Sequence, residues 1–160
     1  MGPGFAHDQA RELTANGQGV IAGLGHKAMV EEIDMEDREI RAALDRHWAA
    51  SDANDFEAEH QIYREDAVLE YPQSGERIRG RRKIQASRAA QPNRKRFTVR
   101  RIIGAGDLWV TEYVLSYDRR PSYTVSIMEF LDGKVARETQ YFGDPFEPGP
   151  SRAQWVERMA

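Results

Sequence analysis

The chain has 160 residues, of which 40% are apolar and 31% charged, and its formal net charge is −3. This length and balance indicate one soluble globular domain with its own core, not a disordered chain. The negative charge argues against nucleic acid as a partner, because phosphate binding needs a basic face. The chain has no cysteine, so disulfides and thiolate chemistry are excluded.

Residues 1–30 are rich in glycine, alanine and polar residues and carry no sustained period. We expect them to form a mobile N-terminal arm, because glycines interrupt every short helical pattern. The start of the chain lacks the basic beginning and continuous apolar centre of a signal peptide, and no apolar run is long enough to span a bilayer. We therefore expect a cytoplasmic protein without a membrane partner.

A long helix is predicted from Val30 onward. Apolar and small residues recur there at helical spacing, with charged residues on the opposite face. The stripe consists of Ile33, Ile40, Leu44, His47, Trp48 and Ser51. Asn54 and Asp55 then break the helix and cap a shorter one, in which we expect His60 to be solvated.

A short strand over residues 67–71 follows, since its residues alternate with period two. Leu69 and Tyr71 share one face, and Pro72 ends the strand because proline cannot donate a ladder hydrogen bond. A tyrosine at the last inward position of a strand is well placed at the mouth of a cavity. A third helix is predicted over residues 81–91.

The remainder is predicted to be an antiparallel meander with strands at 97–103, 108–118, 122–131 and 134–143. Asp132 and Gly133 are a strong signal for a hairpin between the last two. A proline-rich tail leads to a final helix over residues 151–159, where Ser151 and Gln154 have capping-box spacing and Trp155 begins an apolar stripe. Helices come first and long strands later, so the fold class is α+β.

This order of elements resembles the nuclear transport factor 2-like superfamily. The stretch 55–80 and the sequence FLDGKVARETQYFGDPFEPGPSRAQW are similar to its SnoaL-like, polyketide cyclase-like branch. The resemblance covers roughly residues 35–155. It implies a cystatin-like cone, in which a curved antiparallel sheet wraps around the long N-terminal helix and a ligand sits inside. Residues 31–160 would then be a single SnoaL-like domain that includes the C-terminal helix.

The chain also resembles, distantly, the ketosteroid isomerases. Their tyrosine hydrogen-bond donor falls on His47, their general-base aspartate on Tyr71 and their protonated aspartic acid on Ser126. All three catalytic residues differ here, so the resemblance does not support ketosteroid isomerase chemistry.

The superfamily resemblance also implies which residues face the inside of the cone. The candidate catalytic residues are His47, Tyr71 and Glu138. The candidate ligand-binding residues combine a few polar groups with an apolar, aromatic wall, as small-molecule pockets do: Trp48, Tyr63, Leu69, Trp109, Tyr113, Leu115, Ser126, Met128, Gln140 and Phe142.

Each candidate catalytic residue has a second interpretation. His47 is either an acid/base group, since imidazole titrates near neutrality, or a core histidine that bonds a neighbour. Tyr71 either donates a hydrogen bond to a carbonyl or is a half-buried strand tyrosine. Glu138 either has a pKa raised by burial and serves as acid or base, or bonds an arginine. A basic cluster either attracts an anionic ligand or protects a solvated edge strand, the second being favoured; it consists of Arg94, Lys95, Arg96, Arg100 and Arg101.

Two functions are compatible with these features. One is a cofactor-independent acid/base enzyme, of isomerase, cyclase, dehydratase or hydrolase type, acting on a hydrophobic oxygenated substrate. The other is a non-catalytic ligand-binding or interaction module. No His, Asp and Glu cluster has metal-ligand spacing, so we expect no metal and no cofactor. We also expect a homodimer through the outer face of the meander, with Val110, Val114, Val125, Ile127, Val135 and Tyr141 pointing outward. The alternative is that the C-terminal helix folds back and covers part of this face with Trp155.

Overall fold

The computed structural model of the protein describes residues 17–159, and the chain divides into two compact units with the boundary between Glu36 and Asp37. Helix α1 (Gly17–Ala53) contributes to both units. The helix was predicted from Val30, but it begins earlier because glycine lowers helix propensity without stopping a helix that is already propagating. Residues 1–16 of the predicted arm lie outside the described residues. No helix in the described part of the chain is long and apolar enough to cross a membrane.

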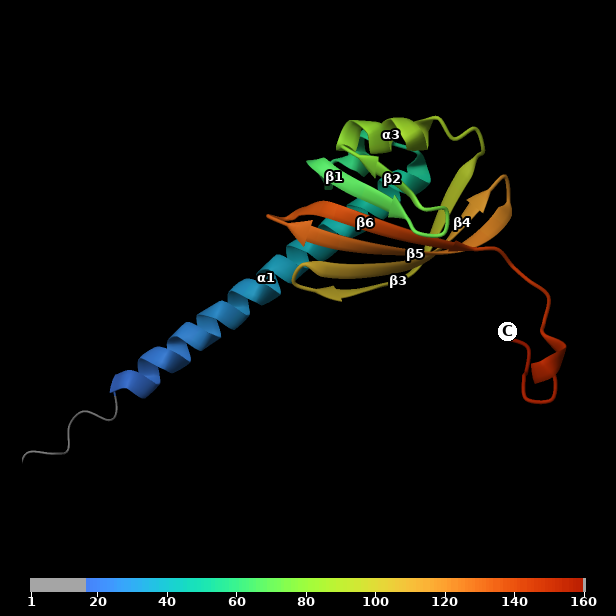
Figure 1. Cartoon of the computed structure of the whole chain (residues 1–160). Coiled ribbons are helices and arrows are strands. Elements are labelled where there is room, and N and C mark those ends of the chain that lie inside the picture. The colour runs from blue at the N-terminus through green and yellow to red at the C-terminus, as the bar shows by residue number, and fades with distance from the viewer. Residues whose placement is uncertain (1–16, 160) are drawn as a thin grey trace, which may run out of the picture. The chain divides into compact units, whose positions relative to one another are not determined.

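The second unit contains the end of α1 and all other elements (Figure 1). In chain order these are α2 (Phe56–His60), β1 (Tyr63–Tyr71), β2 (Glu76–Arg79), α3 (Arg81–Ala89), β3 (Lys95–Ala105), β4 (Leu108–Tyr117), β5 (Arg120–Leu131), β6 (Lys134–Gly143) and the 3-10 helix η1 (Pro150–Arg152).

Local side-chain and backbone chemistry explains where several of these elements begin and end. Asp55 caps α2 by accepting a hydrogen bond from the Ala58 amide at 3.1 Å. Asp132 and Gly133 have φ of 52° and 70°, as a two-residue hairpin turn requires.

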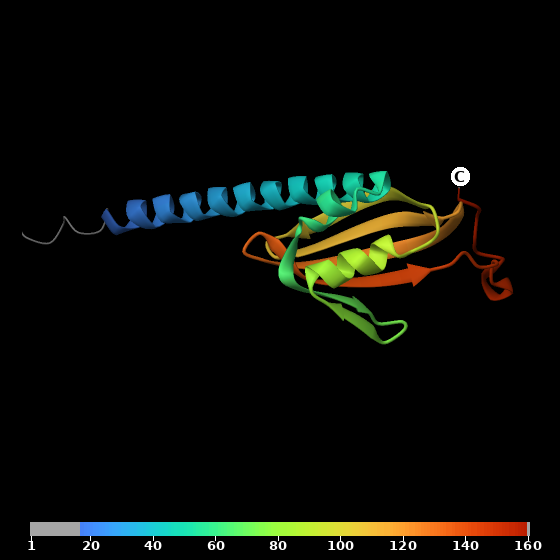
Figure 2. The ribbon, with the colours of Figure 1, turned by 90° about the horizontal axis from the view of Figure 1, so that it is seen from above.

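The six strands form one curved sheet in the order β2-β1-β6-β5-β4-β3, which is not closed (Figure 2). All neighbouring strands are antiparallel except β1 and β6, which run parallel. The predicted α+β class and cone are therefore confirmed, but the sheet is mixed rather than wholly antiparallel. Helix α3 packs against β1 and against α2.

The core lies between the inner face of the sheet and the end of α1. Ile40, Leu44 and Trp48 on α1 are buried, as the predicted stripe requires. Trp48 Nε1 also donates a hydrogen bond to Thr111 Oγ1 on β4 at 3.1 Å. Burying a leucine or isoleucine side chain contributes about 1.5–3 kcal/mol to stability, so this stripe holds the helix against the sheet.

The predicted strand faces are correct for β4 and β5, where Trp109, Tyr113 and Met128 are buried. They are wrong at the start of β6. Val135 was expected to point outward but is fully buried. The register shifts at a β-bulge, since Glu129 pairs with Arg137 while Phe130 pairs with Val135. The extra residue reverses the alternation between these two pairs.

The predicted helix over residues 151–159 is also wrong. Only the 3-10 helix Pro150–Arg152 forms there, followed by a turn. Trp155 is 76% exposed and Met159 is 95% exposed, so the expected apolar stripe is not packed against any of the residues 17–159 that the structure describes. A capping pattern satisfies only the first turn of a helix, and a short segment needs tertiary packing to remain helical.

Candidate functional site

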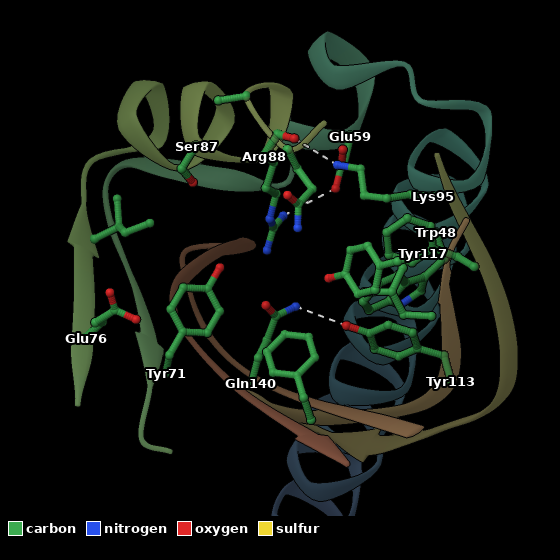
Figure 3. A pocket seen from close by; sticks show the side chains of 16 residues that line it. Trp48, Glu59, Tyr71, Glu76, Ser87, Arg88, Lys95, Tyr113, Tyr117 and Gln140 are labelled. Carbon is green, nitrogen blue, oxygen red and sulfur yellow. Dashed lines mark hydrogen bonds and ion pairs between the residues drawn. The ribbon is translucent and has the colours of Figure 1, made fainter. Parts of the chain in front are cut away.

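A cavity of about 510 Å³ opens in the second unit and is lined by the end of α1, by α2 and α3, and by strands β1, β2, β3, β4 and β6. One part of its wall is apolar and largely aromatic, and the other carries charged and hydroxyl groups (Figure 3). The apolar part contains Trp48, Ile78, Ala90, Phe97, Tyr113, Leu115 and Phe142. The polar part contains Glu59, Tyr71, Glu76, Ser87, Arg88, Gln91, Lys95, Tyr117 and Gln140.

Arg88 dominates the polar part of the wall. It lies on α3 four residues after the fully buried Ile84, so both side chains share the inward face of that helix. Its Nη2 donates to Glu138 Oε2 at 2.8 Å, and its Nη1 donates to Tyr63 Oη at 2.9 Å and to Glu59 Oε1 at 3.3 Å. The side chain is only 12% exposed, so the guanidinium is held in one place by acceptors from β6, β1 and α2.

Glu138 lies directly behind the cavity wall and is fully buried. Oε2 accepts from Arg88 and from the Tyr63 hydroxyl, and Oε1 accepts from Ser126 Oγ at 2.6 Å and from Gln140 Nε2 at 2.9 Å. Burial alone would raise the pKa of Glu138, but Arg88 and the hydrogen bonds from Ser126 and Tyr63 outweigh it and lower the pKa. Glu138 is therefore an ionised carboxylate whose two oxygens are both occupied.

Two tyrosines present hydroxyl groups to the cavity. Burial raises the pKa of Tyr71 and of Tyr117, and the Arg88 charge opposes this in both. Both phenols therefore stay protonated near neutral pH. Each protonated hydroxyl can donate its hydrogen to a ligand.

Gln140 supplies the opposite kind of group. Its Nε2 donates to Tyr113 Oη at 3.0 Å and to Glu138 Oε1 at 2.9 Å, which uses both of its hydrogens. Its carbonyl oxygen remains as an acceptor. The polar ends of Tyr71, Arg88, Tyr117 and Gln140 point toward one common space (Figure 3).

Lys95 lies at the border between the polar and apolar parts. It is 7% exposed, so the solvated-edge alternative does not hold for this residue, although it does hold for the exposed Arg94 and Arg96 on either side. Nζ donates to the Arg88 carbonyl oxygen at 2.9 Å and lies 4.9 Å from the centroid of the Phe56 ring. Burial lowers the pKa of Lys95, and the nearby Glu59 opposes this. Lys95 thus fixes the end of α3 and holds a second cation beside the cavity.

His47 is 2% exposed and is not among the residues that line the cavity. Its Nδ1 lies 2.7 Å from the Glu59 carbonyl oxygen, so Nδ1 carries the hydrogen. Nε2 is buried and has no hydrogen-bond partner among the described residues. Burial lowers the pKa of His47, against the opposing influence of Glu138. The neutral ring therefore keeps an unpaired acceptor nitrogen inside the fold.

His60 is 1% exposed, so the expectation that it is solvated is wrong. Its Nδ1 lies 2.6 Å from the Phe56 carbonyl oxygen, and its ring stacks on Tyr63 with centroids 5.6 Å apart. Burial, helped by the Arg88 charge, lowers the pKa of His60 to about 4. His60 is a neutral packing residue at the end of α2.

The residues predicted from the sequence fall into three groups. The cavity is lined by Trp48, Tyr71, Tyr113, Leu115, Gln140 and Phe142. Polar residues buried outside the lining are His47, Tyr63, Ser126 and Glu138, and core residues outside the lining are Leu69, Trp109 and Met128.

Sequence reasoning missed Glu59, Arg88 and Tyr117 as parts of the site. The position of Arg88 could have been found from its four-residue spacing to Ile84. Within the described residues, no group of three or more His, Asp or Glu side chains is placed to hold a metal ion.

The chain matches the family described as the SnoaL-like domain over residues 44–138, and it therefore belongs to that family. No match was found among curated proteins. Among solved structures, an NTF-2-like protein of unknown function from Burkholderia xenovorans LB400 is 57% identical, covers 79% of this chain and 99% of its own, and has a TM-score of 0.74.

A candidate ketosteroid isomerase from Kribbella flavida DSM 17836 is 26% identical, covers 78% of this chain and 93% of its own, and has a TM-score of 0.72. A candidate polyketide cyclase from Sinorhizobium meliloti is 20% identical, covers 62% of this chain and 94% of its own, and has a TM-score of 0.56, which shows a shared fold. The predicted superfamily, its SnoaL-like branch and the ketosteroid isomerase-like resemblance are confirmed by these matches.

Proposed function

We propose that the protein binds a small, hydrophobic, oxygenated molecule in the cavity and converts it by cofactor-independent proton transfer. The observation that supports this proposal is the convergence of three donors, Arg88, Tyr71 and Tyr117, on one space beside an aromatic wall. The wall favours an apolar ligand body, and the donors favour an oxygen acceptor at one end of the ligand. Isomerisation, cyclisation, dehydration and hydrolysis all suit such a site.

The proposed chemistry relies on the charge that develops on the ligand oxygen when a proton leaves a neighbouring carbon. Arg88 and the Tyr71 hydroxyl stabilise that charge, and Glu138 acts as a positioning residue because it holds Arg88. Glu59 lines the cavity and is placed to take part in the proton transfer. His47 is buried outside the lining, so it takes part only where the proton reaches its unpaired Nε2 through an intervening group.

Hydrogen exchange tests the proposal without knowledge of the natural substrate. The protein is incubated in deuterated water with 2-tetralone and 2-acetylnaphthalene, and deuterium at the carbon beside the carbonyl is measured by mass spectrometry. We expect exchange above the buffer rate, with at least a tenfold decrease in Tyr71→Phe. Tyr123→Phe is the matched control, because Tyr123 is exposed and outside this cavity. No exchange by the wild-type protein contradicts the catalytic proposal.

A second candidate function is a non-catalytic ligand-binding module. Two observations favour it: His47 does not line the cavity, and both oxygens of Glu138 are occupied by neighbours. Binding of these ketones without any hydrogen exchange would support the module and separate the two functions.

A further inference from the structure

The charges around the cavity nearly cancel. The wall holds two inner cations, Arg88 and Lys95, and the inner carboxylate Glu59, while Glu138 adds a second carboxylate directly behind Arg88. The other charged residue of the wall, Glu76, is exposed. The two histidines beside this cluster, His47 and His60, have lowered pKa values and add no positive charge near neutral pH.

This balance limits the charge that a ligand can carry. A carboxylate seated beside Arg88 would bring a third negative charge to a group of two cations and two buried carboxylates. An uncompensated charge in a site of low dielectric costs several kcal/mol, and the ligand would be expelled or protonated. The Arg88 guanidinium is thus already neutralised by protein groups, although it is still able to donate hydrogen bonds.

The hydrogen-bonding groups limit the ligand in a second way. Arg88 and the hydroxyls of Tyr71 and Tyr117 face the common space as donors, so they match an oxygen that accepts. An ammonium group has three hydrogens to donate, and of the four side chains that point into this space only Gln140 presents a carbonyl acceptor, so most of its hydrogens would face donors. The ligand end that fits both limits is an uncharged carbonyl oxygen.

We propose that the cavity selects uncharged carbonyl ligands over carboxylates, and that Glu138 and Glu59 set this selectivity by neutralising Arg88 and Lys95. This inference rests on the proposed function, because it specifies which ligand the same cavity takes. Arg88 is the residue that touches the ligand oxygen. The two glutamates act through it and decide which charge the ligand carries.

Three probes of similar shape test the selectivity: 2-acetylnaphthalene, 2-naphthoate and 2-naphthylmethylammonium. Their dissociation constants are measured by quenching of tryptophan fluorescence at neutral pH, since Trp48 lines the cavity. We expect the wild-type protein to bind the ketone at least about tenfold more tightly than either ion. In Glu138→Gln one negative charge is lost, and the ratio of carboxylate to ketone affinity should rise by about tenfold or more.

Glu59→Gln is the second variant, because it makes the same change in charge at another position in case Glu138→Gln does not fold. Glu129→Gln is the control, since Glu129 is exposed on the outer side of the sheet and should leave the ratio unchanged. Thermal unfolding verifies that each variant is folded. Tighter binding of the carboxylate or the ammonium by the wild type overturns the inference, and so does an unchanged ratio in both glutamate variants. Those results leave the proposed function standing, whereas binding of no probe contradicts both.

Discussion

Arg88 Nη2 lies 2.8 Å from Glu138 Oε2, and this ion pair joins α3 to β6 at the inner end of the cavity. The Glu138 side chain is fully buried and the Arg88 side chain is 12% exposed, so water cannot replace either partner. The pair therefore has two consequences. It fixes the donor that faces the ligand, and it makes the stability of the fold depend on both charges being present.

Removing one partner of this pair should be costly. Arg88→Met leaves the Glu138 carboxylate buried without its cation, and we expect a loss of about 3–5 kcal/mol in the free energy of unfolding. The double variant Arg88→Met/Glu138→Gln should lose less than the sum of the two single variants, because it buries no unpaired charge. Urea denaturation of the three variants gives these values.

Arg101→Met is the control for that series. Arg101 pairs with Glu112 on the solvent-exposed outer face of the sheet, where an ion pair contributes about 0–1 kcal/mol. If Arg88→Met cost no more than Arg101→Met, the Arg88–Glu138 pair would not be an essential part of the fold.

The prediction from sequence succeeded where a short period determines the face of an element. The faces that the resemblance implies for β4 and β5 place Tyr113 and Met128 inside, where they are buried, and the helical stripe correctly buried His47. A stripe gives the direction of a side chain but not its depth. His47 consequently points inward, yet it does not reach the cavity wall.

The failures have physical causes that a local pattern does not contain. Val135 was assigned to the wrong face because the bulge opposite Glu129 adds one residue to the strand. The burial of Lys95 was missed because it depends on how the chain folds back: Nζ reaches the Arg88 carbonyl oxygen at the end of α3 and the ring of Phe56 on α2. Arg88 was missed because α3 is rich in basic residues, and its apolar face is marked by Ile84 alone among the buried residues.

Stability should fall as the solution becomes acidic. The pKa of His60 is lowered to about 4 in the folded protein, against an ordinary value near 6.5 in the unfolded chain. The unfolded state therefore binds the proton first, so the contribution of His60 is complete above pH 6.5 and is lost as the pH falls toward 4. We expect a loss on the order of 2 kcal/mol from His60 across this range, measured by urea denaturation at several pH values.

His60→Gln isolates this effect, because glutamine does not titrate and its amide can still donate to the Phe56 carbonyl. The slope of stability against pH between 6.5 and 4 should become shallower in this variant. Some dependence of stability on pH should remain in this variant, because the pKa of His47 is also lowered by burial. An unchanged slope would assign the acid sensitivity to other groups.

The unpaired nitrogen of His47 distinguishes a role in proton transfer from a role in packing. His47→Asn can keep the donor to the Glu59 carbonyl oxygen while it removes Nε2. If His47 is an acid/base group, the rate of deuterium exchange into bound ketones should fall by about 10²–10⁴-fold, with little change in the thermal midpoint. Full exchange activity together with a lowered midpoint would identify His47 as a structural histidine.

A homodimer through the outer face of the sheet remains a prediction. Val110, Val114, Val125 and Ile127 lie on that face and are only half-buried within the single chain. The C-terminal segment leaves Trp155 exposed, so Trp155 does not cover this face as a packed helix would. We expect light scattering at micromolar concentration to give twice the 18.3 kDa mass of one chain.

Two variants test where the interface lies. Ile127→Arg should shift the protein to the monomer because it buries an unpaired charge in the interface. Ala86→Arg, on the exposed part of α3, should leave the dimer intact. A wild-type mass near that of one chain would exclude the dimer and leave the half-buried valines as ordinary surface residues.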